Sequence, residues 1–390
     1  MSEKDAKKTI FDHEYLSKEQ LKGFDNYKYN CIDNSPLSVY ISHPFWNWLV
    51  EFYPRTWVPN VITLVGWAFV MAGFVIESFL DYDITRNTEG TTNPIPDWFW
   101  LVAAICTFLG HTLDGTDGKQ SRRIGASGPT GELFDHGLDS WSTVPFTITI
   151  FSIFGRGAYS ISTVELLCVL ISTQIVFFAT HWEKYNTGVM FLSWAYDLSQ
   201  YGLVFVYTFT YFSGYQWFQF NIFGVQFAFV FEIGFYACCL FSLIVSAYNI
   251  LNCDKLKQPD FLSGFRPAWP VLVLFASSIY WAVKSPTNVI DVDPRCFFFC
   301  MGTVFSNIAC RLIIAQMSNT MCEVYNTTLA IFLSTIALAF FQPSLELLIL
   351  RVATVAITLV HVHYGVCVVR QLCRHFKINA LSVEYLKNRK

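Results

Sequence analysis

The feature that most constrains the fold of this chain is a series of apolar runs, each about 20 residues long, that recur from residue 58 almost to the C-terminus. A helix needs about 20 apolar residues to cross the roughly 30 Å hydrocarbon layer of a bilayer, whereas helices of soluble cores are shorter and amphipathic. We therefore expect an all-α fold, a polytopic integral membrane helical bundle of about ten transmembrane helices. The predicted spans are residues 58–80, 98–116, 137–155, 160–181, 200–215, 223–250, 268–283, 296–316, 327–346 and 348–370.

Composition supports this fold class and limits the number of domains. The chain is 53% hydrophobic and only 14% charged over 390 residues, which is too little charge to cover a soluble surface of this size. No basic face is present, so nucleic acid is not expected as a partner. We predict a cytosolic or interfacial N-terminal segment (1–57), one transmembrane catalytic domain (58–370) and a cytosolic tail (371–390).

The distribution of basic residues predicts the orientation of the bundle. Most Lys and Arg residues fall in segments 1–57, 117–136, 182–199, 251–267 and 371–390, and few fall in the alternate loops. Basic residues are enriched in cytosolic loops of membrane proteins. Both termini, and the polar 117–136 region, are therefore expected in the cytosol.

The segment before the first span holds a short aromatic stretch that starts at Pro44 and ends near Phe52. A proline is favoured at the first position of a helix, and Trp and Tyr are enriched in the lipid headgroup layer. The stretch predicts an N-terminal interfacial amphipathic helix. A cap packed on the bundle explains the same residues equally well.

Four aspartates border the second and third predicted spans. Asp114 and Asp117 are three residues apart, and Asp135 and Asp139 are four apart, so each pair shares one face of a helix. A carboxylate near hydrocarbon costs at least about 2.5 kcal/mol unless it is paired or metal-bound. If the 118–134 loop folds back as a helical hairpin, the two pairs face each other and offer hard oxygen ligands to Mg²⁺, Mn²⁺ or Ca²⁺.

An acid and an imidazole lie on the same stripe as the aspartates. Glu132 and His136 are four residues apart, which places a carboxylate where it can orient a histidine that acts as a general base. Each of these features alone has a simpler structural explanation, such as a helix cap or a satisfied interfacial histidine. Their combination within residues 114–139 indicates phosphate chemistry.

Basic residues and glycines in the same interval are consistent with an anionic substrate. Lys119, Arg122 and Arg123 place positive charge beside the aspartates, and Gly118 and Gly131 allow the backbone to approach a bulky anion closely. A cytosolic loop would also be basic, so the charge alone does not identify a site.

The spacing of these residues resembles the signature of the CDP-alcohol phosphatidyltransferase family. The matching positions are Asp117, Gly118, Ser121, Arg122, Gly131, Asp135 and Asp139. One position departs, because the family has alanine where this chain has Ser121. Further phrases such as GFDNYKYN, VPNVIT, HWEKYNTG and VHYGV are similar to the eukaryotic ethanolaminephosphotransferase branch that includes selenoprotein I.

The resemblance implies roles for individual residues. It implies that two divalent ions, Mg²⁺ or Mn²⁺, are bound by Asp114, Asp117, Asp135 and Asp139. It also implies that the CDP-alcohol is bound by Asn60, Gly118, Lys119, Ser121, Arg122 and Gly131, with Asn60 at the cytidine. The family's general base has been placed on the last aspartate or on the histidine after the third. We favour His136, supported by Glu132, because a metal-bound Asp139 is a poor base.

The implied reaction is transfer of phosphoethanolamine from CDP-ethanolamine to the 3-hydroxyl of diacylglycerol or alkyl-acyl glycerol, giving phosphatidylethanolamine and CMP. A choline or dual choline/ethanolamine enzyme is the main alternative, since the residues alone do not separate the two head groups. The resemblance also implies a homodimer in the endoplasmic reticulum or Golgi membrane, surrounded by membrane lipids.

Two other classes of membrane protein also place charged residues in apolar helices. An intramembrane prenyltransferase binds its diphosphate through two distant aspartate-rich motifs, whereas both pairs here lie within residues 114–139. A transporter would use polar residues inside its spans, such as Glu232, Arg311 and His361, but these are as readily explained by packing between helices. Both classes are remote alternatives.

Overall fold

The computed structural model describes residues 9–192 and 194–389, with side chains as far as residue 386. Ten long helices occur where the apolar runs predict them, which confirms the all-α fold class. They are α3 (Pro59–Leu80), α4 (Asp97–Ile124), α5 (Pro129–Phe151), α6 (Thr163–Thr187), α7 (Trp194–Ser213), α8 (Phe227–Leu251), α10 (Ala268–Lys284), α12 (Pro294–Ser318), α13 (Thr327–Phe341) and α14 (Glu346–Phe376).

Shorter helices and strands lie at the two ends of the bundle. They are the helices α1 (Lys18–Phe24), α2 (His43–Val50), α9 (Phe261–Phe265) and α11 (Val289–Val292), and the strands β1 (Cys31–Ile32), β2 (Met190–Phe191), β3 (Asn221–Ile222) and β4 (Val225–Gln226). Strand β1 pairs in parallel with β2, and β3 pairs antiparallel with β4. The first of these pairs joins the N-terminal segment to the connection between α6 and α7.

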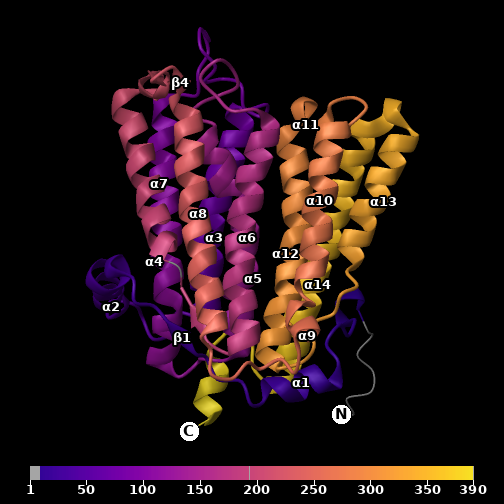
Figure 1. Ribbon diagram of the computed structural model, residues 1–390. Coiled ribbons are helices and arrows are strands. Elements are labelled where there is room, and N and C mark those ends of the chain that lie inside the picture. Colours follow the sequence, from indigo (N-terminus) through magenta and orange to yellow (C-terminus); the bar gives the residue numbers. More distant parts are fainter. Residues whose placement is uncertain (1–8, 193, 390) are drawn as a thin grey trace.

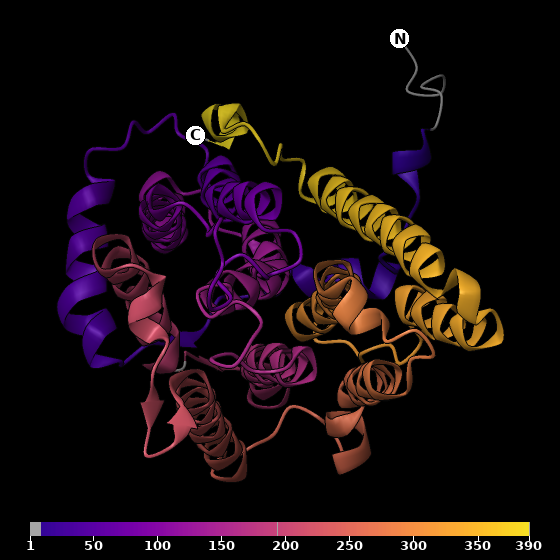
Figure 2. The ribbon, with the colours of Figure 1, turned by 90° about the horizontal axis from the view of Figure 1, so that it is seen from above.

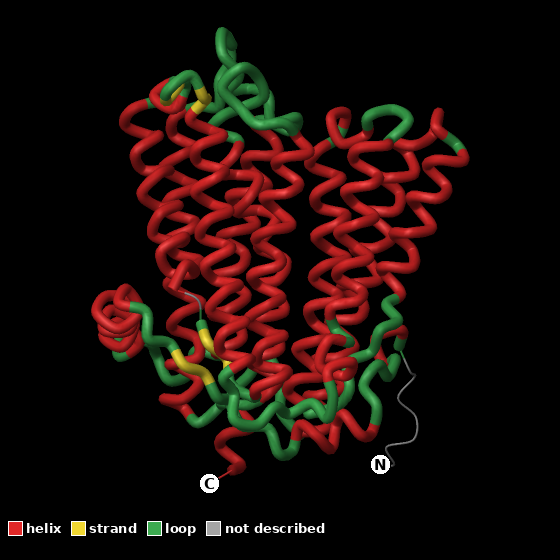
Figure 3. The backbone as a smooth tube through the Cα atoms, viewed as in Figure 1, coloured by secondary structure: helices red, strands yellow, loops and turns green. Residues whose placement is uncertain are grey.

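The long helices run side by side, and their connections gather at the two ends of the bundle (Figure 3). Helices α3 to α8 form one group, and α10, α12, α13 and α14 form a second (Figures 1 and 2). The second group joins the first through α12, which packs against α5 and α6. Helix α1 and the segment that follows α14 lie at the same end of the bundle as the α4–α5 turn (Figure 1).

Several described helices have the length and composition needed to cross a membrane. These are α3, α6, α8, α12 and the segment Pro343–Phe376 that contains α14, while α10 and α13 are apolar but shorter. Helix α8 leaves large apolar side chains exposed along its length, including Leu240, Phe241 and Ile244. A soluble protein would bury such a surface, so the chain is an integral membrane protein.

Helices α4 and α5 form the expected helical hairpin, but the helices are longer, and their connection shorter, than the sequence pattern predicted. The four aspartates lie inside these helices, and the predicted 118–134 loop shrinks to residues 125–128. Gly125, with φ of 74°, ends α4 in the left-handed conformation that suits glycine, and Pro129 begins α5 at its first turn. The polar residues 118–124 and 129–134 are helical. Hydropathy could not indicate this, because it measures solvent preference and not backbone conformation.

Helix α2 occupies the aromatic stretch expected to be interfacial. It starts next to Pro44 and lies beside the lower part of the bundle in Figure 1. Trp46 is buried against Gly115 of α4, where a side chain would collide with the indole ring. Trp48 and Phe52 remain exposed. The helix thus packs on the bundle with one face and presents an aromatic face outward.

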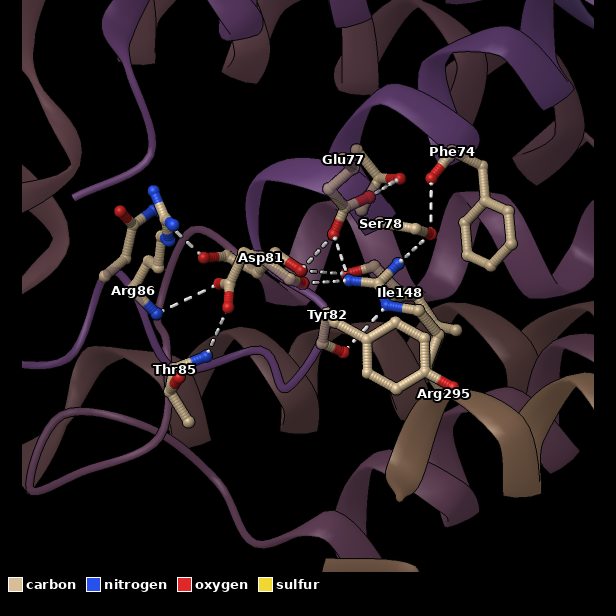
Figure 4. A network of polar contacts seen from close by, with 12 residues as sticks. Phe74, Glu77, Ser78, Asp81, Tyr82, Thr85, Arg86, Ile148 and Arg295 are labelled. Carbon is tan, nitrogen blue, oxygen red and sulfur yellow. Dashed lines mark hydrogen bonds and ion pairs between the residues drawn. The ribbon is translucent and has the colours of Figure 1, made fainter. Parts of the chain in front are cut away.

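A buried ion pair between Arg295 and Glu77 stabilises the end of the bundle opposite to the aspartates, and Figure 4 shows its contacts. Arg295 of α12 donates to Glu77 of α3 at 3.1 Å and to the backbone oxygen atoms of Asp81 and Tyr82 at 2.7 and 3.0 Å. The second Glu77 oxygen accepts from Thr149 of α5 at 2.5 Å. The network therefore joins three helices that meet in the core.

Replacing Arg295 by methionine is expected to destabilise the protein by about 3–5 kcal/mol, because Glu77 would keep a buried charge without its cation. The measurement is the thermal unfolding midpoint in detergent. Arg370→Met is the matched control, since Arg370 is half exposed and shares Asp12 with Arg374; its midpoint should stay near that of the wild type. Equal midpoints for the two variants would contradict a structural role for the Glu77–Arg295 pair.

Candidate active site

Three of the four predicted aspartates converge between α4 and α5. Asp114, Asp135 and Asp139 each place one carboxylate oxygen so that the three oxygens lie within 4.8 Å of one another. All three side chains are half-buried. Carboxylates this close repel one another unless a cation joins them, and oxygen-only donors suit hard divalent ions. The donor set therefore fits Mg²⁺ or Mn²⁺.

The fourth aspartate lies against α3. Asp117 is buried, and its carboxylate accepts a hydrogen bond from the Thr63 hydroxyl. It is not among the three acids whose oxygens converge. On the other side of the cluster, the Tyr196 hydroxyl of α7 donates to Asp114 at 3.1 Å. Sequence reasoning missed both partners: Thr63 belongs to the VPNVIT phrase, but nothing in the sequence indicated Tyr196.

The predicted base, His136, lies beside the cluster. Its Nε2 is 3.8 Å from an oxygen of Asp135, and its Nδ1 is 3.9 Å from an oxygen of Glu132. These distances are too long for hydrogen bonds, and Nδ1 is buried without a partner among the described residues. The ring also lies 5.0 Å, centroid to centroid, from that of His181 on α6. The imidazole is held mainly by packing.

Glu132 lies closer to Tyr27 and Lys184 than to His136. Its carboxylate receives hydrogen bonds from the Tyr27 hydroxyl and from Nζ of Lys184, the latter at 2.5 Å. Lys184 is itself buried, so the two charges compensate each other. Burial and the nearby Glu132 carboxylate raise the pKa of Tyr27 well above its usual range, which keeps the phenol protonated as a donor.

Lys184 is a further residue to which the sequence analysis gave no role. It belongs to the HWEKYNTG phrase, three positions after His181, so both residues share one face of α6. That spacing was a usable signal. It places an imidazole next to His136 and a cation next to Glu132.

The predicted phosphate-binding residues Lys119, Ser121 and Arg122 lie near the C-terminal end of α4 and have different surroundings. Nζ of Lys119 donates to Asn47 of α2 at 2.9 Å, so it is engaged away from the three converging carboxylates. The Ser121 hydroxyl donates to Ser127 at 3.3 Å. Arg122 is exposed, and a side chain on Gly118 would meet its guanidinium at 3.4 Å. Of the two predicted phosphate-binding cations, Lys119 and Arg122, Arg122 is therefore the more exposed.

The last two predicted residues meet at the start of the helices. A Cβ on Gly131 of α5 would lie 3.4 Å from the side-chain oxygen of Asn60 on α3. Both residues line a cavity of about 220 Å³. The structure therefore brings Asn60 and Gly131 together, as expected for parts of one binding site.

These features define an integral membrane protein with a carboxylate cluster suited to divalent cations near one end of a helical bundle. A family model described as CDP-alcohol phosphatidyltransferase matches residues 56–247. Ethanolaminephosphotransferase 1 of Mus musculus is 42% identical over 379 residues, and that of Homo sapiens is 41% identical over 378, each alignment covering 95% of both chains. Cholinephosphotransferase 1 of Mus musculus is 28% identical over 320 residues, covering 79% of this chain and 76% of the relative. The chain belongs to the CDP-alcohol phosphatidyltransferase family.

Proposed function

We propose that this protein transfers phosphoethanolamine from CDP-ethanolamine to the 3-hydroxyl of diacylglycerol or alkyl-acyl glycerol, releasing CMP and leaving phosphatidylethanolamine. The observation that carries the chemistry is the convergence of Asp114, Asp135 and Asp139 beside His136. Relatives named ethanolaminephosphotransferase 1, at 41–42% identity over nearly the whole chain, support the choice of donor. Family membership disfavours the prenyltransferase and transporter alternatives.

The residues that would hold two divalent cations are the three converging aspartates and Asp117. Bound Mg²⁺ or Mn²⁺ would neutralise the pyrophosphate and stabilise the departing CMP phosphate. Arg122, exposed one turn beyond Gly118, would add positive charge at the same phosphates. The hydrogen bond from Thr63 would hold the Asp117 carboxylate in place.

His136 would act as the general base. Its Nδ1 faces Glu132 and its Nε2 faces the carboxylate cluster, so Nε2 is the atom that would receive the proton of the lipid hydroxyl. The hydroxyl oxygen then forms its bond to the phosphorus that carries ethanolamine, and the bond from that phosphorus to the CMP oxygen breaks. The Glu132 carboxylate, held by Lys184 and Tyr27, lies close enough to stabilise the charged form of the ring.

The main alternative remains a choline or dual-specificity enzyme, which the mouse cholinephosphotransferase at 28% identity supports less well. The purified protein in detergent, given diacylglycerol, Mn²⁺ and equal amounts of CDP-ethanolamine and CDP-choline, is expected to form phosphatidylethanolamine in at least roughly tenfold excess, as measured by mass spectrometry of the lipids. A tenfold ratio corresponds to about 1.4 kcal/mol of discrimination. Equal formation of both lipids would indicate a dual enzyme, and neither product would refute the assignment.

The proposal also covers the orientation and location of the enzyme in the membrane. We infer that the cluster end of the bundle and both termini face the cytosol, where CDP-ethanolamine is dissolved, which agrees with the distribution of Lys and Arg. The N-terminal segment 1–57, the transmembrane domain 58–370 and the tail 371–390 would then meet at the cytosolic surface. We further propose a homodimer that resides in the endoplasmic reticulum or Golgi membrane, as the family resemblance implies.

A further inference from the structure

A cavity separates the first turns of α3 and α5 from the C-terminal segment of the chain. It has a volume of about 220 Å³, and one of its walls contains Asn60 and Gly131. The opposite wall is formed by residues far away in the sequence, among them Asn379, Ser382 and Tyr385. None of the roles assigned above uses this second wall.

The cavity lies one helical turn from the carboxylate cluster. On α3, Asn60 precedes Thr63, which donates to Asp117; on α5, Gly131 precedes Asp135 by four residues. One turn of helix rises about 5.4 Å, which is on the order of the distance that a ribose sets between its base and its 5′-phosphate. A nucleotide whose phosphates reach the carboxylates would therefore place its nucleoside in this cavity.

The cavity also offers a polar group that lacks a partner. Thr130 is only 2% exposed, lines the cavity, and has a hydroxyl without a hydrogen-bond partner in the part of the chain that the structure describes. The backbone N–H groups of Gly131 and Glu132, by contrast, already donate to the Gly128 carbonyl. A buried hydroxyl without a partner costs free energy, so Thr130 favours a polar ligand. The edge of a cytosine offers both donors and acceptors.

The C-terminal segment reaches the cavity from the other group of helices. Helix α14 ends at Phe376, and Lys377, with φ of 53°, turns the chain out of the helical direction. Figure 2 shows the yellow segment running from α14 toward the indigo and purple part of the bundle. Just before the segment begins, Nε2 of His375 lies 2.7 Å from a carboxylate oxygen of Asp25 at the end of α1, and this contact holds the start of the segment in place. Its far part lies over the cavity, with Tyr385 half-buried in the wall.

We propose that residues 378–385 close this cavity over the nucleoside end of the CDP donor, and that the Tyr385 ring is a stacking surface for the cytosine. The identity of the donor rests on the proposed function. The segment binds the donor without taking part in bond making, so its loss weakens donor binding and leaves the chemical step and the lipid site intact. An aromatic ring suits this task because every nucleobase has a face that stacks on it.

Steady-state kinetics test this proposal on the wild type, a chain truncated after Lys377, Tyr385→Ala, Tyr385→Phe and a control variant. Truncation and Tyr385→Ala should each raise KM for CDP-ethanolamine roughly tenfold, the scale of one base stacked on an aromatic side chain, with kcat and KM for diacylglycerol within about threefold of wild type. Tyr385→Phe keeps the ring and should behave as wild type. Glu384→Ala is the matched control, because Glu384 is exposed and does not line the cavity.

A second readout separates this proposal from the proposed function. CMP with Mg²⁺ should raise the thermal midpoint of the wild type and of Tyr385→Phe, and should raise that of Tyr385→Ala and of the truncated chain much less. Unchanged donor KM and unchanged stabilisation in Tyr385→Ala would overturn the proposal, even if the truncated chain failed to fold. A wild type that is stabilised by CMP through the tail but forms no phosphatidylethanolamine would refute the proposed function and leave the tail's role standing.

Discussion

Replacing Asp135 by asparagine is expected to lower turnover at least roughly 1,000-fold. The loss of one carboxylate from the cluster weakens the binding of a divalent cation, and such a cation supplies several kcal/mol of transition-state stabilisation. The Asp135 oxygen lies within 4.8 Å of those of Asp114 and Asp139. The measurement is CMP release with CDP-ethanolamine and diacylglycerol at saturating Mn²⁺.

A structural explanation of that loss can be excluded in the same preparation. Removing one of three mutually repelling carboxylates does not weaken the fold, so the midpoint of Asp135→Asn without metal should equal or exceed that of the wild type. Mn²⁺ should stabilise the wild type and have little effect on the variant. Asp97→Asn, at the exposed far end of α4, is the matched control and should keep full activity. Full activity of Asp135→Asn would remove this residue from the site.

Replacing His136 by alanine is expected to lower kcat about 100- to 10,000-fold while changing KM for CDP-ethanolamine little, because a general base acts on the lipid hydroxyl and not on the donor. The nearest carboxylate oxygens lie 3.8 and 3.9 Å from its ring nitrogens, so no strong bond to the protein is lost. Kinetics with saturating diacylglycerol measure the effect.

Two comparisons sharpen that test. His13→Ala, at an exposed position, should retain the activity of the wild type. Lys184→Met should lower kcat less than His136→Ala, since Lys184 acts only by holding Glu132. If His136→Ala keeps near-normal kcat while Asp139→Asn loses it, the base is Asp139, which is the alternative that the family resemblance left open.

The sequence predicted the helices well because the physics of a membrane span is local. A run such as Pro59–Leu80 is long and apolar, and those two properties alone indicate a spanning helix. The same rule did not predict the ends of α4 and α5, where polar residues 118–124 and 129–134 are helical although a loop is expected over 118–134. Hydropathy measures the solvent that a residue prefers and not its backbone conformation, so it could not show that the two helices continue beyond the aspartates.

The site was predictable to the extent that its residues are close in the sequence. Asp135 and Asp139 share a face of one helix, and so do Glu132 and His136. Tyr196, which donates to Asp114, comes from a helix 82 positions away, and no local pattern reports such a contact. The wall of the donor cavity formed by Tyr385 was missed for the same reason.

The most direct test of the central claim is the yield of two products from one reaction. Purified protein with Mn²⁺, CDP-ethanolamine and diacylglycerol should form CMP and phosphatidylethanolamine in equal amounts, and both should disappear when EDTA removes the cation or when diacylglycerol is omitted. CMP released at an undiminished rate without diacylglycerol, or product formed at an undiminished rate after metal removal, would contradict metal-supported transfer of phosphoethanolamine to a lipid hydroxyl.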